Sequence, residues 1–124
     1  MEILQNNEVY ALRITANELM ELFIDTLQKC GVHLLEMSDD SIGYYVFEEF
    51  NSGVTSFLHD NSLFKLKETG LITGTIMQKS AELRHKFMAL ENTDLWNVDS
   101  VKYAKELREV LELSDEIKSA ALSS

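Results

Sequence analysis

The second half of the chain repeats its apolar residues at helical spacing, and this pattern constrains the fold more than any other feature. From residue 75 to residue 91 the apolar side chains form a stripe ~80° wide when each residue advances the helix by about 100°. A shorter helix is predicted over residues 61–69, closed by Gly70, and a final one that Asn97 or Asp99 caps and that runs to about Ala120. We expect the final helix to turn these residues inward: Tyr103, Ala104, Leu107, Val110, Leu111 and Ile117. Such a pattern requires helices packed around a shared core.

A further helix is predicted to begin at Thr15. Thr15 and Glu18 have the spacing of a capping box, in which the threonine hydroxyl accepts from the Glu18 amide and the Glu18 carboxylate reaches back to the Thr15 amide. Apolar residues then follow one face as far as Cys30. Gly31 stands where a left-handed residue would end this helix.

Residues 32–50 allow two interpretations. Residues 32–37 and 42–49 flank residues 38–41, a Ser-Asp-Asp-Ser segment that favours a turn, and this arrangement predicts a β-hairpin. The apolar residues Ile42, Val46, Phe50, Val54 and Phe57 also fit a helix. We favour the hairpin because tyrosine, valine and phenylalanine prefer strands and because Gly43 is a poor helix former. Residues 9–14 are a candidate third strand.

The expected architecture is therefore an α+β fold: one domain over residues 1–124, mostly helical, with four to five helices and one antiparallel hairpin. An all-α bundle is the alternative. A chain of 124 residues has room for one core of ordinary size. Its single cysteine excludes an intramolecular disulfide and fits a cytoplasmic location. No apolar run is long enough for a membrane span, and the start of the chain lacks a secretory signal pattern.

Acidic residues are concentrated in the first half of the chain. Residues 1–60 contain eleven aspartates and glutamates against two basic residues, whereas residues 61–124 contain ten acidic and nine basic residues. The formal net charge of −10 opposes direct binding to nucleic acid or to anionic membranes. Because the excess is confined to one half, we expect it to serve recognition and not only solubility.

Two groups of residues in this half form the candidate partner-binding site. Glu18, Glu21 and Asp25 fall within about 60° of one another on the outer face of the first helix, with no basic neighbour expected at helical spacing. The second group combines tyrosines with carboxylates, as interaction surfaces often do: Asp39, Asp40, Tyr44, Tyr45, Glu48 and Glu49. The competing interpretation is that one tyrosine belongs to the core and that the two aspartates only form a turn.

No pattern of catalytic or metal-binding residues is present. His33, His59 and His85 have no spacing typical of a zinc site, and Cys30 lies on the core side of a helix end. Gly70 and Gly74 lack the residues that complete a phosphate-binding loop. We therefore predict a protein that is not an enzyme and that needs no metal and no cofactor.

The leading hypothesis is an acidic inhibitor that neutralises a basic protein, best matched by the nuclease domain of a bacterial toxin. Nuclease sites must be electropositive to hold phosphates, so a carboxylate surface with tyrosines is complementary to them. This strategy resembles that of toxin-immunity proteins in general, although no motif of a particular family is present. The alternatives are a phage-type nucleic-acid mimic that inhibits a DNA-binding protein, and a structural or adaptor domain. We expect a monomer or a weak dimer.

Overall fold

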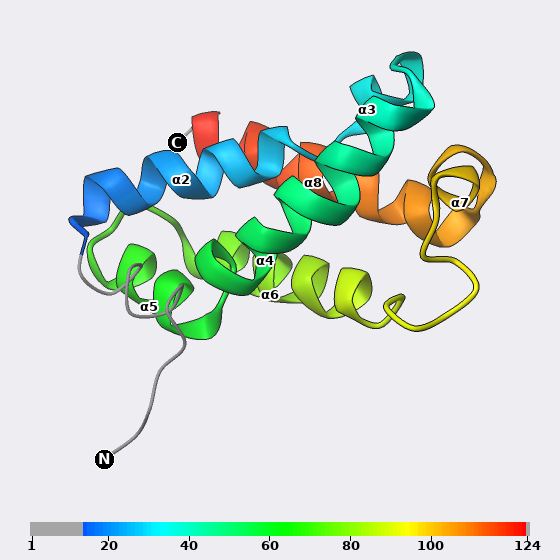
Figure 1. Ribbon diagram of the computed structural model, residues 1–124. Coiled ribbons are helices and arrows are strands. Elements are labelled where there is room, and N and C mark those ends of the chain that lie inside the picture. Colours follow the sequence, from blue (N-terminus) through cyan, green and yellow to red (C-terminus); the bar gives the residue numbers. More distant parts are fainter. Residues whose placement is uncertain (1–13, 124) are drawn as a thin grey trace.

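The computed structural model describes residues 14–123, and every regular element in this range is a helix (Figure 1). In chain order the elements are α2 (Ala16–Gln28), the 3-10 helix η1 (Val32–Glu36), α3 (Asp39–Gly43), the π-helix η2 (Tyr44–Phe50), α4 (Asn51–Phe57), α5 (Asp60–Glu68), α6 (Gly74–Met88), α7 (Val98–Tyr103) and α8 (Lys105–Ser123). The predicted hairpin, and with it the α+β class, is wrong. The described residues have the all-α architecture that was the alternative. The candidate third strand lies outside the described residues except for Ile14, which is in no strand.

Side chains cap several of the helices at their N-termini. Thr15 caps α2, Thr73 caps α6 and Asn97 caps α7, each by accepting a hydrogen bond from the backbone amide three residues ahead. Ser38 does the same for α3, where its hydroxyl accepts from the Ser41 amide at 3.3 Å. The segment that was predicted to be a hairpin turn is therefore the cap and first turn of a helix, because serine and aspartate favour both positions.

Helices α3, η2 and α4 follow one another without a break in helical backbone from Asp39 to Phe57. Their fully buried residues are spaced four apart: Ile42, Val46, Phe50, Val54 and, just after α4, Leu58. In an α-helix, four residues rotate about the helix axis by about 40° more than one full turn. A stripe of residues spaced four apart would therefore turn gradually away from the core. The wider i→i+5 turns of η2 reduce that rotation, which explains why a rare π-helix occurs here.

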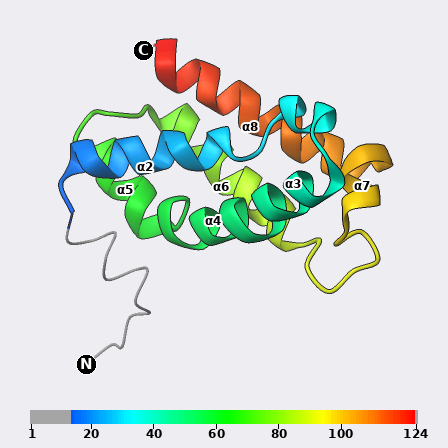
Figure 2. The same cartoon turned by 45° about the horizontal axis from the view of Figure 1, so that its top comes forward.

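Helix α2 packs against α8 on one side and against α4 and α5 on others, while α6 packs against α8 and α5. Figure 2 shows α2 lying between α8 and α4. The core between these helices contains the largest buried side chains, among them Phe23, Phe50, Phe87 and Leu107. The predicted burial of Leu107 is confirmed, and Phe87, which belongs to the apolar stripe predicted over residues 75–91, is buried as expected. None of the helices within residues 14–123 combines the length and the apolar composition needed to cross a bilayer.

Two helix ends differ from prediction. Gly31 has an extended backbone, with a φ of −172°, and a Cβ atom there would lie 2.3 Å from Asp115, so close approach and not handedness requires glycine. The final helix is divided at Ala104, whose ψ of 137° is not helical, so Asn97 caps α7 and not α8. Because of this break Tyr103 leaves the register of Leu107: it is 80% exposed and not inward as predicted.

Candidate protein-binding surface

The three carboxylates predicted to form a ridge on α2 have different surroundings. Glu18 belongs to the helix cap: the Thr15 hydroxyl donates to its Oε1 at 2.9 Å and accepts from its backbone amide at 3.1 Å. Asp25 lies 3.7 Å from Lys29, one helical turn further on, so the prediction that the ridge has no basic neighbour is wrong at this position. Glu21 is exposed and has no ion pair with any residue in the range 14–123. Glu21 is therefore the ridge residue whose charge is least compensated.

Lys29 connects the ridge to the second predicted group. Its Nζ lies 3.7 Å from Asp25 Oδ2 and also 3.7 Å from Glu49 Oε1 on η2. The Tyr44 hydroxyl donates to the same Glu49 oxygen at 2.7 Å. A chain of polar contacts thus runs from the end of α2 to η2, and a single lysine is shared between two carboxylates.

Tyr44 and Tyr45 occupy different environments. Tyr44 is 47% exposed, whereas Tyr45 is partly buried and packs against the core cluster. Their rings meet edge to face, with centroids 5.5 Å apart. The hydrogen bond to Glu49, together with the negative charge of Glu49, raises the pKa of Tyr44 above its ordinary value of 10.0. Tyr44 is accordingly the ring that is available to a partner.

Asp40, Tyr44 and Glu48 form the stripe of η2 and α3 that faces away from the core. They repeat every four residues, as the buried residues Ile42 and Val46 do, and they are offset from those by half a turn. All three are exposed, and neither carboxylate has an ion pair among the described residues. We call these three residues the tyrosine stripe.

Asp39 does not belong to this stripe. Its Oδ1 accepts a hydrogen bond from Lys102 Nζ at 3.0 Å, so the lysine compensates the negative charge of Asp39, and this contact raises the pKa of Lys102. This contact between α3 and α7 joins residues far apart in the chain, so helical spacing could not reveal it. Of the nine predicted site residues, the structure thus places Tyr45 partly buried against the core, Glu18 in a cap and Asp39 in an ion pair.

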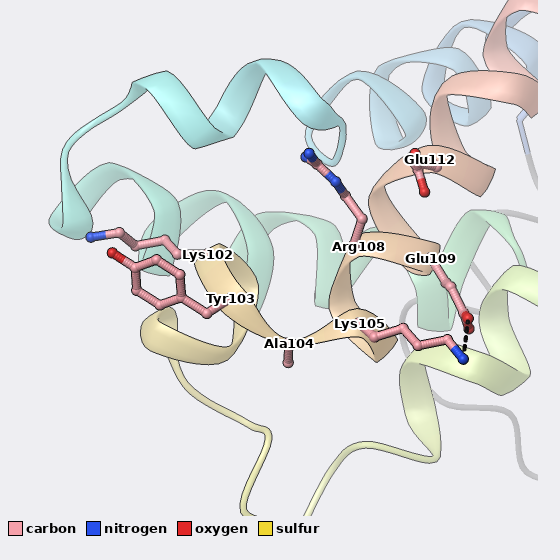
Figure 3. A pocket seen from close by; sticks show the side chains of 7 residues that line it. All are labelled: Lys102, Tyr103, Ala104, Lys105, Arg108, Glu109 and Glu112. Carbon is pink, nitrogen blue, oxygen red and sulfur yellow. Dashed lines mark ion pairs between the residues drawn. The ribbon is translucent and has the colours of Figure 1, made fainter.

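A groove that the sequence did not predict lies at the junction of α7 and α8 (Figure 3). Its volume is about 570 Å³, and the side chains that line it come from Lys102, Tyr103, Ala104, Lys105, Arg108, Glu109 and Glu112. Figure 3 shows Lys102 beside Tyr103 at one end and Lys105 with Glu109 at the other, where the pair is 3.9 Å apart. Charges of both signs line this groove, so it does not select the sign of a ligand.

Two of the histidines considered from the sequence, and the cysteine, have contacts within the fold. The Nδ1 atom of His59 accepts from the Asn61 amide at 3.2 Å and so caps α5. His85 lies beside Arg84, with 3.2 Å between Nε2 and Nη2. Cys30 is fully buried, and burial together with the nearby Asp115 carboxylate raises the pKa of its thiol. Within residues 14–123 no three potential metal ligands of the His, Cys, Asp and Glu types come together.

Comparisons with protein families, with curated proteins and with solved structures found no match to this chain.

Proposed function

We propose that this protein binds a basic partner protein through the tyrosine stripe and the adjoining carboxylates, and that it inhibits this partner without catalysing a reaction. The observation that carries the proposal is the stripe itself: an exposed aromatic ring between two carboxylates that have no ion pair among the described residues. Between residues 14 and 60 the chain has nine acidic side chains and a single lysine or arginine, Lys29. A partner that lies on this face must supply the missing positive charge.

Tyr44 has the properties of an energetic centre of an interface. Tyrosine combines a large apolar ring with a hydroxyl that keeps a polar contact, and it is enriched among the residues that dominate binding energy. The 2.7 Å hydrogen bond to Glu49 and the edge contact with Tyr45 hold the ring in place before a partner arrives. Less conformational freedom is then lost on binding.

The partner class that fits best is the nuclease domain of a bacterial toxin. A nuclease must present lysine and arginine side chains to hold phosphates, and these attract a carboxylate surface over long distances and speed its association. Such an inhibitor acts where the toxin would act, so a cytoplasmic location is part of the same proposal. The chain's own potential nucleophile, Cys30, is buried with a raised pKa, which favours a binding role over a catalytic one.

The test begins with the full chain isolated from its native host at low salt, together with whatever protein co-elutes at a fixed ratio. We expect one basic partner whose nuclease activity falls to zero at an equimolar amount of this protein. Tyr44→Ala should weaken binding about 30-fold, as for a central interface tyrosine. Tyr103→Ala is the matched control, because Tyr103 is even more exposed but lies on α7, and it should leave the affinity unchanged.

Carboxylate variants complete the test. Glu48→Gln should weaken binding more at low salt than at high salt, since salt screens exposed charges, whereas Glu82→Gln on the exposed face of α6 should not. Equal affinity of wild type, Tyr44→Ala and Glu48→Gln at every salt concentration would contradict the proposal. A partner that DNA displaces from the stripe would instead assign the chain to the nucleic-acid mimics.

A further inference from the structure

A groove of about 470 Å³ lies between the outer face of α2 and the end of α8. Met20, Ile24 and Gln28 line it along α2, and Leu122 of α8 lines its other side. Leu122 is 62% exposed, while Met20 and Ile24 are partly buried against the core. The groove therefore offers an apolar floor that remains open to solvent.

The charges on the rim of this groove are all negative. Glu21 and Asp25 are its charged lining residues. Glu21 has no ion pair within residues 14–123, and Asp25 shares Lys29 with Glu49 over two distances of 3.7 Å. An occupant that buries the floor would leave these carboxylates beside it, so it must carry cationic side chains along the edges of an apolar face.

The shape of the groove favours a helical occupant. Met20, Ile24 and Gln28 are spaced four apart and so mark a line along α2 that is about 12 Å long at 1.5 Å per residue. Helices pack by laying side-chain ridges into grooves of this kind, and an amphipathic helix in an apolar groove is a common mode of peptide recognition. Addition of a strand needs a sheet edge, and the part of the chain that the structure describes has none.

We infer that this groove binds a cationic amphipathic helix of the partner protein, with apolar side chains on Ile24 and Leu122 and with lysines or arginines facing Glu21 and Asp25. The inference rests on the proposed function and names the element of the partner that would be recognised. The groove between α5 and α6 is a useful contrast. It has about 430 Å³ and an exposed Phe64, but its one charged lining residue, Asp60, already accepts from Arg84 at 2.9 Å.

The test uses a helix-forming peptide of leucine and lysine in which the leucines occupy one face, and a permuted peptide of the same composition without an apolar face. Binding to the full chain is measured by fluorescence anisotropy. We expect the amphipathic peptide to bind about ten-fold more weakly to Leu122→Lys than to wild type, because the floor loses apolar area and gains a like charge. Phe64→Lys is the matched control: it changes charge equally at a residue of similar exposure, 59% against 62%, and should alter the affinity less than about two-fold.

A second pair of variants tests the rim independently of the floor. Glu21→Lys should weaken binding of the amphipathic peptide, and Glu82→Lys, on the exposed face of α6, should do so much less. The inference is wrong if Leu122→Lys and Phe64→Lys lower the affinity equally, or if the permuted peptide binds as tightly as the amphipathic one. Tyr44→Ala separates the two proposals, since it should weaken the native partner but not the peptide. If the native partner responds to Tyr44→Ala while the peptide fails to bind, only the groove inference is overturned.

Discussion

Replacement of Phe87 by alanine tests the aromatic packing that joins α6, η2 and the connection after α6. The Phe87 ring is fully buried. Its centroid lies 4.9 Å from that of Phe50, at 73°, and 4.9 Å from that of Trp96, at 46°. The three rings come from three different segments, so truncation of the central one leaves a space that no single segment can close.

The expected loss follows from these contacts. Removal of a buried phenylalanine side chain costs about 3–5 kcal/mol, and each aromatic pair adds about 0.5–1.5 kcal/mol beyond the area that it buries. Because two such pairs are lost and collapse is restricted, we expect about 4–5 kcal/mol. A domain of this length unfolds with roughly 6–19 kcal/mol in total, at about 0.05–0.15 kcal/mol per residue. Phe87→Ala should therefore remain folded at low temperature with much reduced stability.

Urea denaturation measures this loss. Trp96 is the single tryptophan of the chain and adjoins the altered site, so its fluorescence reports the transition, and far-UV circular dichroism provides a second signal that does not depend on the local environment. Met88→Ala is the control, because the next side chain along α6 is 43% exposed and should change stability by less than about 1 kcal/mol. A loss below about 2 kcal/mol for Phe87→Ala would refute the argument that these three rings form one packed unit.

Three further predictions concern titratable side chains. The hydrogen bond to Glu49 raises the pKa of Tyr44, so the stability that this hydrogen bond provides is present at neutral pH and is lost as the pH rises from the ordinary tyrosine pKa through the raised pKa. An NMR titration should show a lower Tyr44 pKa in Glu49→Gln than in wild type. An unchanged Tyr44 pKa would exclude Glu49 as the cause of the shift. Cys30 should not react with a thiol reagent until the chain unfolds, since burial raises the pKa of its thiol; reaction of the native protein at the rate of a free cysteine would contradict its burial. Glu21→Gln should leave the free energy of unfolding within about 0.5 kcal/mol of wild type in thermal denaturation while it weakens partner binding at low salt; a loss above about 1 kcal/mol would mean that Glu21 has a stabilising contact in the free protein.

The segment from Ser38 to Leu58 shows where inference from sequence reaches its limit. Its apolar residues are spaced four apart, and this spacing fits two geometries. Residues four apart lie on the same side of a helix, and they also lie on the same face of a strand, because strand side chains alternate with a period of two. The preference of Tyr44, Tyr45 and Val46 for strands is an average over many surroundings, and contacts with the core override it here. Burial of Ile42, Val46 and Phe50 on one face fits either geometry, so the spacing alone does not choose between them. Packing of this segment against the other helices of the core decides in favour of the helix.

The charged site shows a different limit. Helical spacing placed Glu18, Glu21 and Asp25 on one face of α2, and that part holds because their positions depend on one helix alone. The contact of Lys29 with Asp25 follows from the same rule, since the two residues are four apart on one helix face. The contacts of Lys29 with Glu49 and of Asp39 with Lys102 could not be predicted from helical spacing. Each contact joins two separate elements, and the spacing within one helix does not determine how two elements are placed relative to each other.

The sequence by itself determined the features that depend on neighbours a few residues away. The caps at Thr15, Thr73 and Asn97 are hydrogen bonds over three residues, and the buried faces of α2 and α6 follow from the helical repeat. Charge asymmetry between the halves of the chain is likewise a property of the sequence. Only the tertiary structure decided that residues 39–50 are helical, which tyrosine is exposed, and that Leu122 meets α2 to form a groove. These depend on which helices share a core, and the free energy of that choice comes from contacts between residues far apart in the chain.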